Sequence, residues 1–148
     1  MQHALPRPNA DTAAFWQAAA RGELILQHCA SCGHWQFPPS RRCACGAAPR
    51  WQQVSGRGIV ASHTLVHRAP TAAFRAALPY LVALVRLTEG PRLMLHLRGA
   101  AAEAPQIGQA VRIHFDPPAG PDGIALPYAV AEEIPRADAA APLKQRQC

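Results

Sequence analysis

The chain has 148 residues, of which 49% are hydrophobic and 16% are charged. This composition excludes an intrinsically disordered protein and fits one ordinary domain or two small units. With 15 prolines and 10 glycines, the chain favours short strands over long helices. The formal net charge of +6 allows an anionic partner, although such a charge also serves solubility.

No segment of the sequence has the pattern of a targeting or membrane segment. The N-terminal residues lack the apolar stretch of a signal peptide. No apolar run approaches the ~20 residues that span a bilayer. We therefore expect a cytoplasmic protein whose cysteines sit in a reducing compartment, where a metal is favoured over disulfides.

Residues 1–22 are expected to form a polar, proline-containing arm and one short helix. Asn9 or Asp11 can cap the helix, and Gly22 is a natural stop after its alanine-rich run. The adjacent large rings of Phe15 and Trp16 must dock on something. The surface that receives them is either this chain's own domain or a partner subunit, and the sequence leaves both open.

The most specific motif lies in residues 23–55, where two cysteine pairs are each followed by a glycine. The pairs are Cys29 with Cys32 and Cys43 with Cys45, and ten residues separate them. Thiolates are the ligands that zinc prefers in structural sites, and this spacing suits the two corners of a small β-ribbon. The sequence therefore predicts one structural Zn²⁺ held by these four residues.

The second pair departs from the usual spacing, because one residue instead of two separates its cysteines. His28 or His34 could then replace one of the thiolates as a ligand. A metal-free cysteine cluster or a pair of disulfides would also be compatible with this pattern. Trp35 and Phe37 follow the first pair as an apolar lid and, with the helix aromatics, are candidates for an interface with a partner.

Residues 56–134 alternate between apolar and polar positions, as half-buried strands do. Strands are expected at residues 59–66, 81–87, 93–98, 111–115 and 128–134. Five such strands fit a small closed barrel of the OB type. The alternation places His63 on the same face as Ile59 and Leu65, as a barrel-lining residue. Residues 135–148 are expected to be a disordered tail in which Cys148 is a free thiol.

The order of helix, four-cysteine ribbon, Gly-x-Gly joint and five-strand barrel resembles the zinc-ribbon OB-fold family associated with acyl-CoA metabolism. The resemblance covers about residues 9–134, through the runs FWQAAARGELILQHCASCGHWQFPPSRRC, VSGRGIVASHTLVHRAP, LPYLVALVRLTEGPRLMLHL and IGQAVRIHF. It implies a mainly β protein with an N-terminal helix, a rubredoxin-like zinc ribbon and a five-stranded OB-fold barrel.

The resemblance also implies a role. Members of this family are non-catalytic accessory subunits that pair with a thiolase-like acyltransferase, an aldolase or an acyl-CoA hydratase, and help to hold the CoA thioester at the substrate entrance. The residues agree, because the sequence contains no G-x-S-x-G, H-E-x-x-H or Walker motif. We therefore expect no catalytic residue in this chain.

The long connection after the first barrel strand carries the candidates for contact with CoA or with an enzyme partner. They are His67, Arg68, Phe74, Arg75 and Tyr80. Cations beside aromatic rings can receive the phosphates and adenine of CoA or the acidic rim of an enzyme. The simpler interpretation is an ordinary loop with solvated arginines.

Single-stranded nucleic-acid binding is the competing function, since zinc ribbons and OB barrels both do this and the charge agrees. Such binders stack bases on aromatic side chains across the central strands. Here those strands present Arg86, Met94, His96 and Arg98, without an aromatic residue among them. Nucleic acid is therefore disfavoured, and a redox or metal-relay role ranks last.

Overall fold

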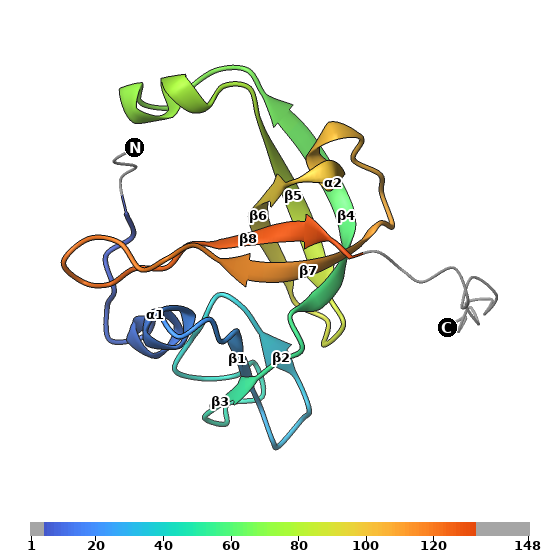
Figure 1. Cartoon of the computed structure of the whole chain (residues 1–148). Helices are drawn as coiled ribbons and strands as arrows, with labels where there is room; N and C mark the ends of the chain where they lie inside the picture. The colour runs from blue at the N-terminus through green and yellow to red at the C-terminus, as the bar shows by residue number, and fades with distance from the viewer. Residues whose placement is uncertain (1–4, 133–148) are drawn as a thin grey trace.

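The structure, a computed structural model, describes residues 5–132. The expected tail at 135–148, with Cys148, lies outside the described residues, as do the last two residues of the expected final strand. Figure 1 shows a helix and a small sheet packed below a barrel. In chain order the elements are α1 (Ala13–Ala19), β1 (Ile25–His28), β2 (Trp35–Gln36), β3 (Arg50–Gln53), β4 (Arg57–Val66), the 3₁₀ helix η1 (Ala72–Ala77), β5 (Tyr80–Leu87), β6 (Arg92–Arg98), α2 (Ala100–Glu103), β7 (Ala110–Phe115) and β8 (Pro127–Ala131).

Helix α1 follows a turn that Asn9 holds, although its N-cap is Thr12 and not the expected Asn9 or Asp11. The Asn9 side-chain oxygen accepts hydrogen bonds from the backbone N–H groups of Asp11 (3.0 Å) and Thr12 (2.9 Å), which holds the turn before the helix. Gly22, with a φ of 76°, turns the chain away after the helix. Phe15 is buried at 4% exposure, so this ring docks on its own chain.

The ribbon is a three-stranded antiparallel sheet in the order β2-β1-β3, with β1 in the middle. Gln27 of β1 pairs with Gln36 on one side and with Trp51 on the other. Leu24 and Leu26 are buried and belong to the same hydrophobic cluster as Phe15 and the barrel interior. The ribbon and the barrel therefore share one core.

The barrel is closed, with its strands in the order β4-β5-β6-β8-β7. Strand β4 pairs with both β5 and β7, and β6 pairs in parallel with β8. This closed five-stranded arrangement confirms the predicted OB-fold architecture. Every second residue of β5 and β6 is buried inside the barrel: Leu81, Ala83, Val85, Leu87, Leu93, Leu95 and Leu97.

Strand β4 departs from the predicted alternation, because its register with β5 shifts between Val60 and Ser62. Ile59 pairs with the exposed Arg86, whereas His63 pairs with the buried Ala83. The prediction that Ile59 and His63 share a face is therefore wrong, although His63 does face the barrel interior. A bulge inserts one extra residue into a strand and so exchanges its two faces.

Two short helices occupy the connections that were expected to be plain loops. Helix η1 lies between β4 and β5 and forms the upper left arm of the molecule in Figure 1. Helix α2 packs against β6 and β8. Within residues 5–132 no helix has the length and apolar character needed to cross a membrane.

Gly58 provides a test of the barrel packing. A Cβ atom there would lie 2.5 Å from the carbonyl oxygen of Arg86 and 2.9 Å from Cγ1 of Val85. We expect Gly58→Ala to lower the free energy of unfolding by about 3 kcal/mol, the upper end of the usual cost of overpacking, because the nearest atom belongs to the backbone. The matched control is Gly108→Ala, where φ is 86° but nothing lies within 4 Å, and it should cost about 1–2 kcal/mol. Chemical denaturation measures both, and an equal loss in the two variants would contradict the role of close packing at Gly58.

Candidate metal centre and adjoining groove

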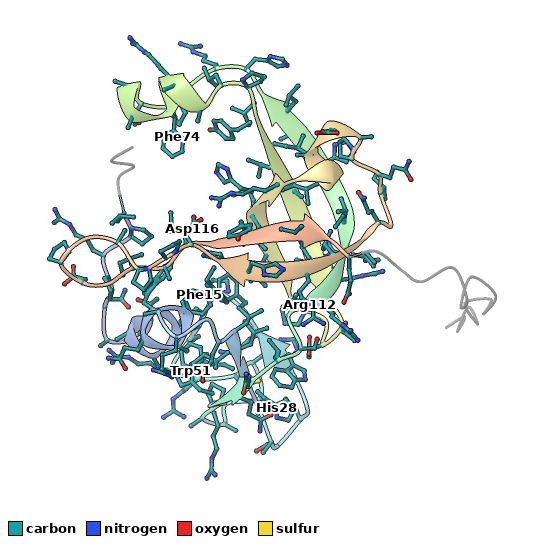
Figure 2. All side chains as sticks on the ribbon, viewed as in Figure 1. Phe15, His28, Trp51, Phe74, Arg112 and Asp116 are labelled. Atoms are coloured by element: carbon teal, nitrogen blue, oxygen red, sulfur yellow. The ribbon has the colours of Figure 1, made fainter. Side chains whose placement is uncertain are left out.

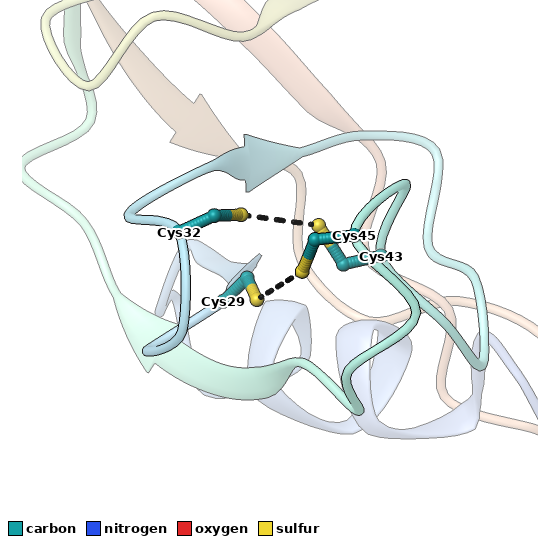
Figure 3. A group of neighbouring side chains, drawn as sticks. All are labelled: Cys29, Cys32, Cys43 and Cys45. Atoms are coloured by element: carbon teal, nitrogen blue, oxygen red, sulfur yellow. Dashed lines mark hydrogen bonds between the residues drawn. The ribbon is translucent and has the colours of Figure 1, made fainter.

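The four predicted cysteines converge at the far corner of the ribbon (Figure 3). The Sγ atoms of Cys29 and Cys45 are 3.5 Å apart, as are those of Cys32 and Cys43, and all four lie within 4.8 Å of one another. A tetrahedral zinc ion with Zn–S bonds of about 2.3 Å separates its sulfur ligands by about 3.8 Å. The four thiols therefore fit one zinc ion.

Two glycine turns place the cysteine pairs. Gly33 has a φ of 71° and donates its backbone N–H to the carbonyl of Cys29 at 2.8 Å. Gly46 has a φ of 88° and makes the same contact with Cys43 at 2.8 Å. A left-handed residue after each pair folds the backbone around the sulfurs, which an L side chain at that position would oppose.

The electrostatics of the cluster favour a bound cation. The backbone N–H of Cys32 lowers the pKa of the Cys29 thiol from 9.0 to about 6, although burial opposes this. The backbone N–H of His34 also lowers the pKa of Cys32, but its neighbours Cys43, Cys45 and Cys29 together raise that pKa to about 12. One thiolate thus forms readily and opposes the ionisation of the next. A divalent cation offsets this repulsion.

The geometry does not fit disulfides or a histidine ligand. The sulfurs are 3.5 Å apart in their closest pairs, well beyond the ~2.05 Å of a disulfide bond. Among the described residues, the group close enough to share one ion consists of the four cysteines and includes neither His28 nor His34. The His28 ring instead packs against Trp35, with 4.5 Å between the ring centroids. The short spacing of Cys43 and Cys45 does not prevent convergence.

A groove of about 620 Å³ lies where α1, the ribbon and the barrel meet. Its lining is mainly apolar and comes from six parts of the chain. Pro6 and Thr12 come from the N-terminal arm, Phe15 and Trp16 from α1, Phe37, Pro38 and Pro39 from the ribbon, Phe74 and Ala77 from η1, Leu93, Met94, Leu95, His96 and Arg98 from β6, and Asp116, Leu126 and Pro127 from the connection into β8. Figure 2 shows Phe74 above and Phe15 below this space, with Asp116 between them.

A row of planar side chains runs from the groove across the outer face of the barrel. Phe74 contacts Tyr80 at 5.7 Å between ring centroids, and Tyr80 stacks on His96 at 4.9 Å with the rings 10° from parallel. Tyr128, on the neighbouring strand, lies opposite His96. The Arg98 guanidinium sits 4.1 Å above the Tyr128 ring. The predicted absence of aromatics from this face is therefore wrong.

Arg98 also forms the charged edge of the groove. Its guanidinium donates to both carboxylate oxygens of Asp116, with the Nη2–Oδ2 distance at 2.9 Å. The hydrogen bond to Asp116 raises the pKa of Arg98. The pair lies at the ends of two strands that β8 separates, so sequence spacing does not predict it. An acidic residue directly after a barrel strand was the available signal.

The predicted contact residues separate into two groups. Phe74 lines the groove and Tyr80 supports it through ring contacts. His67, Arg68 and Arg75 are exposed on the connection around η1, outside the groove lining.

The predicted interface aromatics separate in the same way. Trp16 and Phe37 are partly exposed and line the groove. Phe15 also lines the groove but is mostly covered by its own chain. Trp35 faces a separate hollow beside Gly90 and Pro91.

The fold and the four-sulfur site together define a zinc ribbon joined to an OB-fold barrel. The family model for the rubredoxin-like zinc ribbon domain of ChsH2 matches residues 16–49, and the model for the C-terminal OB-fold domain of ChsH2 matches residues 51–116. The chain belongs to the ChsH2/DUF35 family, and this confirms the resemblance seen in the sequence.

This chain covers most of the length of two relatives. A solved structure described as "Ltp2-ChsH2(DUF35) aldolase" superposes with a TM-score of 0.73 and is 36% identical, over 85% of this chain and 98% of that one. A DUF35 domain-containing scaffold protein of Methanocaldococcus jannaschii is 32% identical over 62% of this chain and 67% of that protein.

Two further relatives are subunits of hydratases. A probable enoyl-CoA hydratase alpha subunit of Thermomonospora curvata is 41% identical over 72% of this chain. The 3-oxo-4,17-pregnadiene-20-carboxyl-CoA hydratase alpha subunit of Mycobacterium tuberculosis is 37% identical over 74%. The chain matches only about a third of each of these subunits, 34% and 35%.

Loss of one thiolate tests the metal site. We expect Cys29→Ser and Cys45→Ser each to lose the zinc and to lower the Tm, because the ribbon has little core of its own. Cys148→Ser and His34→Ala are the controls and should keep about one zinc per chain. Elemental analysis and thermal melting measure both quantities. Full zinc retention in Cys45→Ser would show that this residue is not a ligand.

The lowered pKa of Cys29 predicts a pH dependence. A thiol whose pKa is lowered to about 6 is charged at neutral pH and binds a proton again as the pH falls through 6. Because bound zinc competes with that proton, zinc retention, and the stability that depends on it, should fall at a pH below about 6 and not above it. Dialysis over a pH series followed by zinc analysis gives the midpoint. Unchanged zinc content well below that pH would refute the prediction.

Proposed function

We propose that this protein is a non-catalytic accessory subunit of an acyl-CoA-processing complex. A thiolase-like enzyme, an aldolase or a hydratase subunit supplies the catalytic residues, and this chain helps to form the substrate entrance and stabilises its partner. The observation that carries the proposal is the apolar groove built jointly by helix, ribbon and barrel. Its volume of about 620 Å³ lies within the ~300–1,000 Å³ range of small-molecule sites.

The chemistry of a CoA thioester suits the two parts of this surface. The acyl group and the pantetheine arm are largely apolar and match a lining that includes Trp16, Phe37 and Met94. The phosphates are anionic and match the exposed cations Arg68 and Arg75, on the same connection as the groove residue Phe74. The hydratase subunits among the relatives carry CoA thioesters in their names.

The lining of the groove supports a role without catalysis by this chain alone. It includes no cysteine, serine or lysine among the described residues, and the hydroxyl of the lining residue Thr12 is already hydrogen-bonded to Asn9. Both oxygens of Asp116 accept hydrogen bonds from Arg98. The cysteines of the described segment point at one another in the ribbon. A nucleophile and its base would therefore come from the enzyme partner.

Co-purification tests the complex. We expect the full chain, purified from its native host, to elute from size exclusion together with a thiolase-type or hydratase-type subunit. Turnover of an acyl-CoA should need the enzyme subunit, and the chain alone should show none. Separate elution of the two proteins at both low and physiological salt would contradict this proposal.

Met94 tests the groove itself. It lies on the groove floor with 76% exposure, so Met94→Glu should fold normally. A carboxylate there loses apolar contact, and we expect acyl-CoA turnover by the complex, or its assembly, to weaken by about tenfold or more. Ile107→Glu is the matched control, since Ile107 is 72% exposed and lies outside the groove lining. Equal effects of the two substitutions would argue against a working groove.

Single-stranded nucleic-acid binding is the second candidate, because Tyr80, His96 and Tyr128 form a ring row on an OB barrel. Fluorescence anisotropy with a labelled oligonucleotide decides between the two. Tight binding at physiological salt that is lost in Tyr80→Ala would favour this candidate over the accessory subunit.

A further inference from the structure

Four arginines gather on the outer face of the barrel, at the start of β4 and β6, the end of β5 and within β7. They are Arg57, Arg86, Arg92 and Arg112, and we call them the arginine face. Arg86 lies directly opposite Arg92 in the pairing of β5 with β6, and Arg57 lies opposite Arg112 in the pairing of β4 with β7. Figure 2 shows Arg112 near the ribbon end of the barrel.

A bound anion would reduce the repulsion within these like-charged pairs. Like charges directly opposite one another destabilise a sheet, and the arginine face contains two such pairs. Glu132 accepts from both Arg57 and Arg112, each at 3.2 Å. Within residues 5–132, no carboxylate forms an ion pair with Arg86 or Arg92. The face therefore keeps an excess of positive charge on its side chains.

The surface between these strands is hollowed. A depression of about 450 Å³ is lined by Arg57, Ile59, Arg86, Thr88 and Glu132, among other residues. The guanidinium groups of Arg57 and Arg86 thus border a shallow site in which a short segment of chain can lie. A guanidinium binds a planar carboxylate through two parallel hydrogen bonds.

We propose that the arginine face binds an acidic segment of a protein partner. A protein is favoured over a nucleic acid because Glu132 gives the face mixed charges, which suit a protein surface with complementary charges. The stacking rings that a single strand needs are Tyr80 and Tyr128, which lie outside this depression. Arg92 and the groove residue Met94 share the outer face of β6, so a partner seated over the groove can reach the arginine face. For the identity of that partner the proposal rests on the proposed function.

The acidic chemistry is tested on the zinc-loaded full chain alone, so the result does not depend on finding the enzyme subunit. The probe is a short fluorescein-labelled poly-glutamate peptide, measured by anisotropy at several salt concentrations. We expect saturable, salt-sensitive binding that weakens by at least about tenfold in Arg86→Gln/Arg92→Gln. The control Arg7→Gln/Arg50→Gln removes the same charge from exposed arginines elsewhere and should bind like the parent.

A second variant separates binding from folding. Arg92→Glu replaces a like-charge pair with an opposite-charge pair, so its Tm should equal or exceed that of the parent while peptide binding is lost. A lower Tm would show that Arg92 serves the fold, and would overturn the proposal. Equal weakening in both double variants, no saturable binding, or tighter binding of a single-stranded oligonucleotide of the same charge through Arg86 and Arg92 would overturn it as well.

Discussion

Four sulfur atoms at one corner of the ribbon are the constraint on which the rest of the molecule depends. Strands β1, β2 and β3 have four, two and four residues, too few to bury a core of their own. The ribbon contributes mainly Leu24 and Leu26 to the buried cluster. A zinc ion bound by four thiolates supplies the missing cross-link, and its binding free energy then becomes folding free energy. The metal therefore acts by holding the ribbon together, and none of its four cysteine ligands lines the groove.

The groove follows from that constraint. Phe37, Pro38 and Pro39 form one wall, and they lie on the segment that joins the two cysteine pairs. Trp16 and Phe15 form the adjacent wall, and Phe15 packs into the core shared by ribbon and barrel. Because one continuous core supports both walls and the β6 floor, the lining is held before any ligand arrives. Such preorganisation reduces the ordering cost of binding.

The features that local chemistry determines were predictable from the sequence. Cysteine spacing indicated the metal site, and the alternation in β5 and β6 indicated the barrel. The features that depend on tertiary contact were not. The bulge in β4 moves His63 to the opposite face from Ile59, and no residue of that strand signals it. Arg98 and Asp116 are 18 residues apart and meet through strand order. The sequence alone does not decide whether Phe15 belongs to the core or to an interface, because the decision depends on its contact with the ribbon.

The register of strand β6 in the barrel determines both the binding surfaces on its outer face and the core on its inner face. In β6 the residues Leu93, Leu95 and Leu97 fill the interior, and Arg92, Met94, His96 and Arg98 make the outer face. The groove floor and part of the arginine face thus alternate, residue by residue, with the buried leucines. A shift of one residue in this strand would exchange the two sets, because side chains of a strand alternate with a period of two. Such a shift would bury arginines without partners, which costs free energy. That cost therefore fixes the position of the outer residues together with that of the buried leucines.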